Sequence, residues 1–147
     1  MCATKYLQVA KKYVEMCNKS KNFMQFAGGV SFLRPISVSE GRVKVEFEVT
    51  PAMTNPWGGL HGGCTATLVD VVTTLACLVT PRGKPGVSVD LHVTYLAAIR
   101  EGDTVIMDAE VIKAGKTLAF TRADVILKEG NRIAATGLHT KAFPPEK

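Results

Sequence analysis

The chain has 147 residues, 46% of them hydrophobic, and a formal net charge of +5. This length and composition predict one domain with a sizeable core. No apolar run reaches the ~18 residues of a membrane span, and the N-terminus lacks the apolar block of a secretory signal. The positive charge suits an anionic ligand or a negative surface, or serves only solubility. Because no basic run is interleaved with aromatic residues, we expect no nucleic-acid partner.

The four cysteines show no CxxC or metal-finger spacing; they are Cys2, Cys17, Cys64 and Cys77. Without a secretory signal, we expect free thiols in a reducing compartment and therefore a cytoplasmic protein. Three dispersed histidines form no ligand cluster, so no metal is implied. Cys64 precedes a long apolar stretch, and we expect a buried structural thiol there rather than a nucleophile.

An amphipathic helix is expected within residues 1–27, and its pattern is clearest over residues 3–26. Apolar residues recur at helical spacing and oppose several lysines. We favour a helix that packs on the domain. The alternative is a basic address for a membrane surface or for mitochondria, so mitochondrial association stays open. The Gly28-Gly29 pair ends the pattern, and residues 28–143 are expected to form the core of the single domain 1–147.

Two short strands are expected next. Residues 30–33 and 36–38 predict a strand that Pro35 interrupts, which indicates a sheet edge or a bulge. Over residues 43–49, Val and Phe alternate with Lys and Glu. This alternation predicts a strand with one dry face and one wet face.

The longest apolar stretch, residues 64–79, contains neither Gly nor Pro. Its apolar residues recur at three- and four-residue spacing, which predicts a long helix that is buried on most sides. Pro81 and Gly83 end the helix. Asp70 lies inside this stretch between apolar neighbours, where a charge is costly unless it is paired or has a function.

Four further strands are predicted over residues 87–95, 104–113, 117–128 and 132–142. Hairpin-sized turns join the last three, so the sheet is expected to be antiparallel and the fold class α+β. In the first of these strands, apolar residues alternate with polar ones, which predicts a dry and a wet face.

Two positions suggest chemistry from the residues alone. Gly62 stands where the central helix should begin, and unpaired backbone N–H groups there can stabilise an oxyanion. The same glycine would equally suit a sharp turn into the helix. Asp70 can act as a general base or as a nucleophile. The alternative is a buried carboxylate that a threonine hydroxyl or a charge on another strand satisfies.

The combination of Asn55, His61-Gly62-Gly63, Asp70 and the strand Gly86–Tyr95 resembles the hotdog-fold acyl-coenzyme A thioesterases. The resemblance implies a hotdog fold, in which a twisted antiparallel sheet wraps a long central helix, here with an extra N-terminal helix. It implies hydrolysis of medium- to long-chain fatty acyl-CoA to free fatty acid and coenzyme A in lipid metabolism, without a cofactor. It also implies homodimers that pair into homotetramers.

The resemblance assigns catalysis to Asp70 as the carboxylate, to Gly62 as oxyanion donor, and to Asn55, His61 and Ser88. In the family, the equivalent serine helps to hold the nucleophilic water. Contacts to coenzyme A are implied for Asp90, Tyr95, Arg100, Lys113, Gly115, Lys116, Thr117 and Lys141. The N–H groups of the turn around Gly115 are expected to offer an anion nest for phosphate.

From the residues alone, several of these positions have ordinary explanations. His61 suits a turn or a helix cap, and Asn55 followed by proline suits a turn start. Ser88 with its neighbours suits a solvated strand face, and the lysines of residues 113–117 suit a solvated hairpin tip. Trp57 departs from what the family leads us to expect, and we expect it to narrow or reshape the acyl channel.

Two competing functions use the same kind of pocket: a non-catalytic acyl-CoA or fatty-acid binding protein and a hotdog dehydratase. Dehydratases of this fold space their histidine and carboxylate differently, and an intact Asp70 argues against pure binding. Gly62 and Asp70 are eight residues apart, or ~12 Å along one helix. One thioester group cannot lie within reach of both Gly62 and Asp70 of the same helix. We therefore expect the active site to span two antiparallel copies of the helix.

Overall fold

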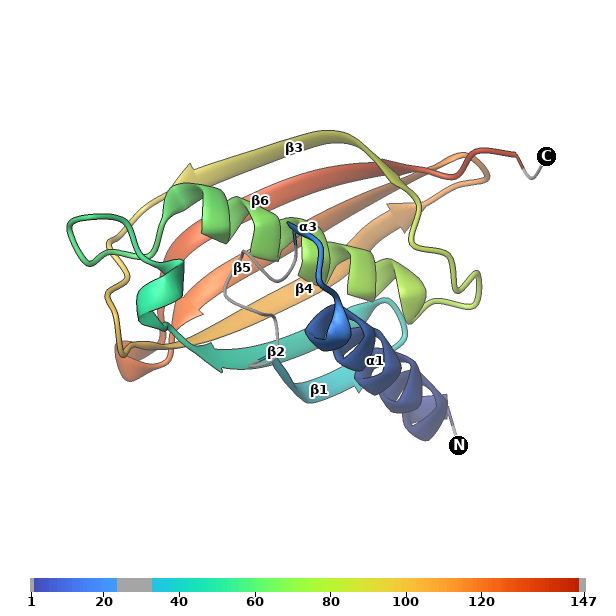
Figure 1. The fold of residues 1–147 in the computed structure, drawn as a ribbon. Coiled ribbons are helices and arrows are strands. Elements are labelled where there is room, and N and C mark those ends of the chain that lie inside the picture. The colour runs from blue at the N-terminus through green and yellow to red at the C-terminus, as the bar shows by residue number, and fades with distance from the viewer. Residues whose placement is uncertain (1, 24–32, 146–147) are drawn as a thin grey trace.

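The computed structural model describes residues 2–23 and 33–145. Within them, two α-helices, two short 3-10 helices and six strands follow one another along the chain (Figure 1). Their bounds are α1 Cys2–Lys19, β1 Arg34–Ser39, β2 Arg42–Glu48, η2 Pro51–Met53, α3 Gly62–Leu78, β3 Val87–Tyr95, β4 Thr104–Ala114, β5 Leu118–Leu127, η3 Glu129–Asn131 and β6 Arg132–Ala142. This confirms the predicted order of helix, two strands, long helix and four strands.

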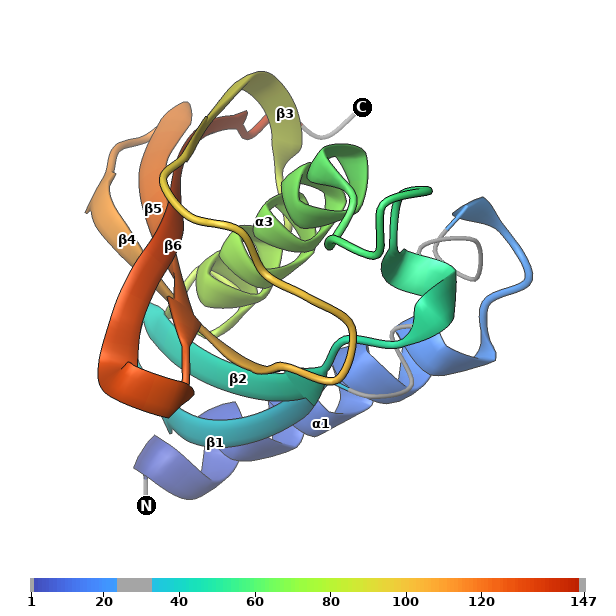
Figure 2. The ribbon, with the colours of Figure 1, turned by 90° about the vertical axis from the view of Figure 1, so that its left-hand side faces the viewer.

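All six strands form one antiparallel sheet in the order β1-β2-β4-β5-β6-β3. The sheet is strongly twisted and curls around α3, which lies along its concave side (Figures 1 and 2). The α+β class and the wrapped central helix are therefore confirmed. β1 is one edge, and its register shifts between Pro35 and Ser37, so both an edge and a bulge are present as Pro35 predicted.

α3 is held close to the sheet by apolar packing. Val69, Val72 and Leu75 are fully buried against the sheet, and residues 71–77 are buried throughout. Gly137 on β6 permits this approach, because a Cβ at that position would lie 2.5 Å from Val69 Cγ1. The prediction of a helix buried on most sides is thus confirmed for its second half, whereas its first half keeps an open face.

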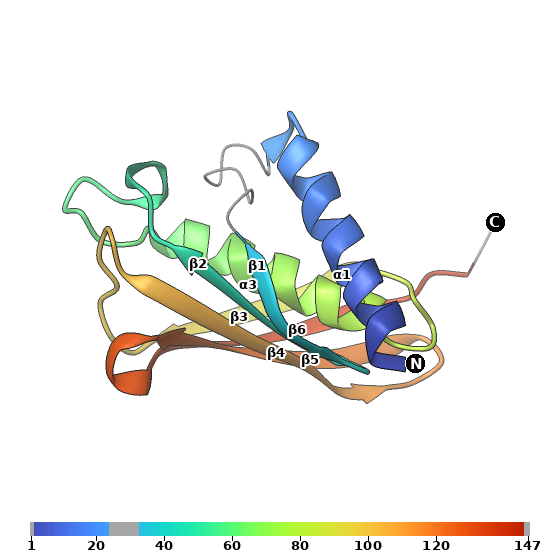
Figure 3. The ribbon, with the colours of Figure 1, turned by 90° about the horizontal axis from the view of Figure 1, so that it is seen from below.

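α1 packs beside β1 and α3 outside the curl of the sheet (Figure 3). Ala10 and Val14 are buried, and the hydroxyl of Tyr6 donates to Glu40 at 3.1 Å. The interpretation as a helix packed on the domain is confirmed. The helix ends at Lys19, however, because the polar run over residues 18–22 has no apolar residue to place against the core. Residues 24–27 and 30–32, where the remaining helix and a strand were predicted, lie outside the described residues.

β3 has the predicted bounds but not the predicted burial. It is the second edge of the sheet, and both of its faces are largely exposed in the single chain. Val87 and Val89 are 53% and 57% exposed, so the expected dry face is uncovered. Alternation predicted one apolar face, but the register of β3 shifts between Ser88 and Asp90, which places Ser88 opposite the buried Lys141 and Leu91 opposite the buried His139. Nothing within the described chain covers Val87 and Val89.

No described helix is long and apolar enough to cross a membrane.

Candidate active site

His61 is the N-cap of α3. Its backbone is extended, and its ring Nδ1 accepts a hydrogen bond from the backbone N–H of Gly63 at 2.9 Å. The expected cap role is therefore present. Because Nδ1 is the acceptor, a neutral His61 carries its proton on Nε2, which remains a donor for a ligand at the helix start.

Gly62 is the first residue of α3, where backbone N–H groups lack partners within the helix. Within residues 2–23 and 33–145 no acceptor meets its N–H. Its carbonyl accepts from the hydroxyl of Tyr95 at 2.5 Å, which ties the end of β3 to the helix start. A Cβ at Gly62 would already lie 3.4 Å from Tyr95 Oη, so glycine keeps this N–H accessible.

Asn55 shapes the loop that precedes the helix. Its Oδ1 accepts from the backbone N–H groups of Trp57 and Gly59 at 3.0 and 3.2 Å, as expected for a turn residue. This leaves the amide N–H groups of Asn55 available beside Gly62, and both residues line a pocket of about 330 Å³. Trp57 is 89% exposed and lines neither this pocket nor the apolar pocket beside His61, so in the single chain it does not narrow either one. We call Asn55, His61, Gly62 and Tyr95 the donor cluster.

Asp70 lies two turns further along α3, and its side chain is 45% exposed rather than buried. Its Oδ1 accepts from the hydroxyl of Thr74 at 3.3 Å and lies 3.6 Å from Nζ of Lys141. Both contacts that would explain a structural carboxylate are therefore present. The carboxylate nevertheless keeps an open side, which a general base or nucleophile needs.

Lys141 has a different place from the one predicted for a phosphate contact. The residue is only 3% exposed, and its ammonium donates to Thr74 at 2.8 Å beside Asp70. Its position on β6 explains this, because alternate residues of β6 face α3. In this chain Lys141 is thus part of the carboxylate's surroundings and not of an exposed basic surface.

His139 is the residue that the sequence prediction missed. It is 1% exposed on β6, with Nδ1 2.7 Å from the hydroxyl of Thr73 and Nε2 2.9 Å from that of Ser88. Ser88 is therefore joined to a buried network rather than merely solvated. Burial, with the nearby Lys141 ammonium, lowers the pKa of His139 below its ordinary value, against the attraction of Asp70 and Asp90.

A signal for His139 exists in the sequence. His139 and Lys141 continue the alternation of Ala135 and Gly137, all of which face the helix. Polar residues in the buried phase of a strand need partners, so this phase marks a polar network. We call Asp70, Thr73, Thr74, Ser88, His139 and Lys141 the carboxylate cluster.

The predicted phosphate-binding turn joins β4 to β5. Lys113 and Lys116 are exposed there, next to Thr117. The N–H of Gly115 already donates to Leu118 at 2.7 Å, so it is not free to join the predicted anion nest. Arg82 donates to the carbonyls of Gly115 and Lys116 and stacks on a nearby aromatic ring.

A pocket of about 510 Å³ lies beside this turn and is lined by Arg82, Lys84, Lys116, Thr117, Phe143, Pro144 and Pro145. Its lining offers cationic side chains around an aromatic ring. Such a surface suits a phosphorylated nucleotide, which needs positive charge and a stacking partner.

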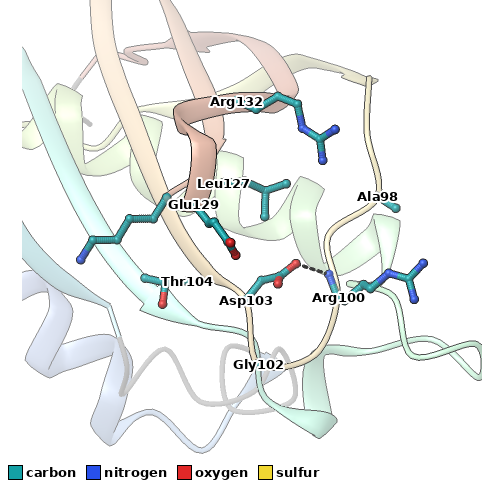
Figure 4. A pocket seen from close by; sticks show the side chains of 9 residues that line it. Ala98, Arg100, Gly102, Asp103, Thr104, Leu127, Glu129 and Arg132 are labelled. Atoms are coloured by element: carbon teal, nitrogen blue, oxygen red, sulfur yellow. Dashed lines mark hydrogen bonds between the residues drawn. The ribbon is translucent and has the colours of Figure 1, made fainter.

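Arg100 lies at the opposite end of the sheet. It lines a pocket of about 600 Å³ together with Arg132 and Glu129. Its backbone N–H donates to the carboxylate of Asp103 (Figure 4). The whole of β4 separates it from Lys113, a distance of about 30 Å. One chain therefore does not bring Arg100 and the lysine turn to the same ligand. Asp90 is exposed on the edge strand β3, opposite Thr140.

Comparison with known proteins identifies the family. The model of the thioesterase superfamily matches residues 58–134, which include the helix start and Asp70. This chain belongs to the thioesterase superfamily. Acyl-coenzyme A thioesterase 13 of Homo sapiens is 41% identical over 138 residues, which are 94% of this chain and 96% of the relative.

Two solved thioesterase structures are also similar. Thioesterase superfamily member 2 from zebrafish has a TM-score of 0.86 and 38% identity, and the match covers 91% of this chain and 95% of the other. The same member from Mus musculus has a TM-score of 0.81 and 33% identity, with 92% and 97% covered. The hotdog fold expected for this thioesterase is thus confirmed.

Cys64 is partly buried, and this burial raises the pKa of its thiol to about 11. The raised pKa disfavours the thiolate, in line with the structural role expected for Cys64. No three His, Cys, Asp or Glu side chains gather into a possible metal site among residues 2–23 and 33–145.

Thioester hydrolysis needs a donor for the oxyanion and an activated water at one carbon atom. In the single chain the donor cluster and the carboxylate cluster lie at different levels of α3, since Gly62 and Asp70 are two helical turns apart. The structure therefore joins the predicted catalytic residues into two groups rather than one.

Proposed function

We propose that this thioesterase hydrolyses medium- to long-chain fatty acyl-CoA to free fatty acid and coenzyme A. The observation that carries the proposal is the uncapped N–H of Gly62, next to the amide of Asn55, at a pocket mouth. In the proposed reaction these donors bind the carbonyl oxygen while Asp70 draws a proton from water. The water oxygen bonds to the carbonyl carbon, the carbon–sulfur bond breaks, and the sulfur leaves as the thiol after it takes up a proton. The reaction uses water and no cofactor.

The test is release of free thiol from palmitoyl-CoA and from a series of shorter acyl-CoA substrates, followed with a thiol reagent. A non-catalytic binding protein is the second candidate, since it would use the same pockets. It would bind palmitoyl-CoA without releasing thiol, and that result would refute the proposed hydrolysis.

We propose that the active site forms between two copies of the chain. The exposed apolar face and free edge of β3 support a second copy there, because an uncovered apolar edge strand favours pairing. An antiparallel pair of α3 helices would place Gly62 of one chain opposite Asp70 of the other. Two equivalent sites would follow from the two-fold axis, and we further propose that such dimers pair into tetramers.

The same arrangement suits the long coenzyme A moiety. We propose that Arg100, Tyr95 and Asp90 of one copy and the turn of Lys113, Lys116 and Thr117 of another contact it. The distance of about 30 Å along β4 within one chain supports this division. The basic pocket beside Arg82 would receive the nucleotide end.

Replacing Lys113 and Lys116 by Ala should raise KM for acyl-CoA several-fold and leave kcat nearly unchanged, because each lysine contributes screened attraction to phosphate. The effect should shrink at high salt. An acyl-pantetheine thioester, which lacks the nucleotide, should react as with the unchanged protein. The matched control is the Ala pair at Lys11 and Lys12 on α1, which removes the same charge elsewhere. An equal rise in KM for acyl-CoA and for the acyl-pantetheine thioester would contradict the assignment of these lysines to phosphate binding.

The acyl chain needs an apolar cavity next to the thioester. We propose the pocket of about 280 Å³ on the other side of the helix start, lined by Phe23, Ala52, Met53, Thr54, His61, Gly63, Cys64 and Thr67. Its apolar walls and its position beside His61 support a fatty acyl chain.

Cys64→Leu should therefore shift the preferred substrate to shorter chains, because the larger side chain fills the cavity. Loss of kcat/KM should be about tenfold for palmitoyl-CoA, the loss that exclusion of two methylene groups produces. Cys64→Ala is the matched control and should not shorten the preferred chain. A uniform loss across the acyl-CoA series would count against this pocket.

For the location we propose the cytoplasm with mitochondrial association. The basic face of α1, with lysines at positions 5, 11, 12 and 19, supports contact with an anionic membrane surface. Co-fractionation of the tagged full chain with mitochondria, lost when these lysines become glutamines, would test it.

A further inference from the structure

A series of hydrogen bonds within the carboxylate cluster joins three elements of the fold. It runs from Thr73 on α3 to His139 on β6 at 2.7 Å and on to Ser88 on β3 at 2.9 Å. Thr73 and His139 are almost fully buried, whereas Ser88 is exposed. The buried Thr73 and His139 can therefore fix the orientation of the exposed Ser88 hydroxyl.

The direction of these bonds follows from the single proton of the Thr73 hydroxyl. That oxygen lies 2.7 Å from the carbonyl of Val69 and 3.1 Å from the carbonyl of Asp70, and a carbonyl can only accept. The hydroxyl proton is thus directed to the helix backbone. The Nδ1 atom of His139 must then donate to Thr73 Oγ1. The Asp70 carboxylate, 3.7 Å from the same Nδ1, also favours a proton there.

His139 has only this one proton to place. Burial and Lys141 on the same strand lower the pKa of the ring, and Asp70 on α3 and Asp90 on β3 oppose them without cancelling the effect. The ring is therefore neutral near pH 7. With Nδ1 protonated, Nε2 has a free lone pair, so the hydroxyl of Ser88 donates to it.

We propose that Thr73 and His139 are positioning residues that hold Ser88 as a hydrogen-bond acceptor toward the attacking water. Ser88 has its proton committed to His139, and its remaining lone pairs can only accept. The Asp70 carboxylate also only accepts. A water between them donates one hydrogen to each and turns a lone pair toward the thioester carbon. This inference rests on the proposed thioester hydrolysis.

The tautomer can be measured without any substrate. Long-range ¹H–¹⁵N spectra at a pH of ~8, above the ordinary histidine range, separate protonated from unprotonated ring nitrogens. We expect His139 with a protonated Nδ1 and a bare Nε2. His61, whose Nδ1 accepts from Gly63, should show the opposite pattern and is the internal control. A protonated Nε2 in His139 would overturn the inference even if the protein hydrolyses thioesters.

The coupling can be measured with a double-mutant cycle. Ser88→Ala and His139→Leu should each lower kcat about tenfold, the effect of one lost hydrogen bond, and leave KM within about twofold. The double variant should be no worse than Ser88→Ala, because His139 acts through Ser88. Multiplicative losses, or losses confined to KM, would contradict the relay.

Two further variants distinguish a positioning role of His139 and Thr73 from a purely structural one. His139→Gln places an acceptor oxygen near the position of Nε2 and should recover much of kcat. Thr73→Val keeps the shape but removes the acceptor of the Nδ1 proton, so it should lower kcat and disturb the His139 tautomer together. A lowered thermal midpoint with an unchanged tautomer and kcat in Thr73→Val would show a structural role only and would overturn the inference.

Discussion

Asp70→Asn should lower kcat by about 10²-fold or more, because it removes the base and keeps the shape of the side chain. The asparagine can still accept from Thr74, which contacts the carboxylate at 3.3 Å, so the fold should be retained. Thermal unfolding together with kcat and KM for palmitoyl-CoA checks both expectations. The buried Lys141 would lose its anionic neighbour, so a modest loss of stability is also expected.

Asp108→Asn is a suitable control for this experiment. Asp108 lies on β4 and pairs with Arg42 and Lys44, so its replacement removes one carboxylate from an ion pair outside both clusters. It should leave kcat nearly unchanged. If Asp70→Asn keeps the turnover of the unchanged chain, then Asp70 is structural and the proposed mechanism is wrong.

Mixing two inactive variants should restore activity. Gly62→Val should block oxyanion binding at the donor cluster. Side-chain atoms at that position would contact Tyr95 and cover the open N–H of residue 62. Asp70→Asn removes the base. When the two are unfolded and refolded together, about a quarter of full activity should return if chains pair at random. Half of the dimers are then mixed, and each mixed dimer has one site with both lesions and one with neither.

The controls for this experiment are each variant refolded alone and a mass measurement of the mixture. Each variant alone should stay inactive, and the mixture should contain heterodimers. Heterodimers without recovered activity would exclude a site shared between copies. A fully active monomer would exclude it as well.

The order of elements and most of their bounds follow from local rules. The bounds of β3 and β6 agree with the predicted residue ranges, since apolar and polar residues alternate along residues 87–95, and a turn before Arg132 and the prolines after Ala142 bound the last strand. The resemblance to a known family assigned Asn55, His61 and Gly62 to one site, and the structure places all three at the start of α3 because they are close along the chain. Strand and helix bounds likewise depend mainly on neighbours in sequence.

Other features depended on contacts between distant segments. His139 and Ser88 are 51 residues apart, and their bond exists only because β3 lies beside β6 in the sheet. Lys141 was predicted for a phosphate contact, yet its strand phase turns it toward α3. The sequence alone determined an α+β chain with one long, mostly buried apolar helix that carries Asp70, and it allowed a backbone donor at the start of that helix. Only the tertiary structure decided which polar residues surround Asp70, because strand order and helix packing, not spacing along the chain, bring their side chains together.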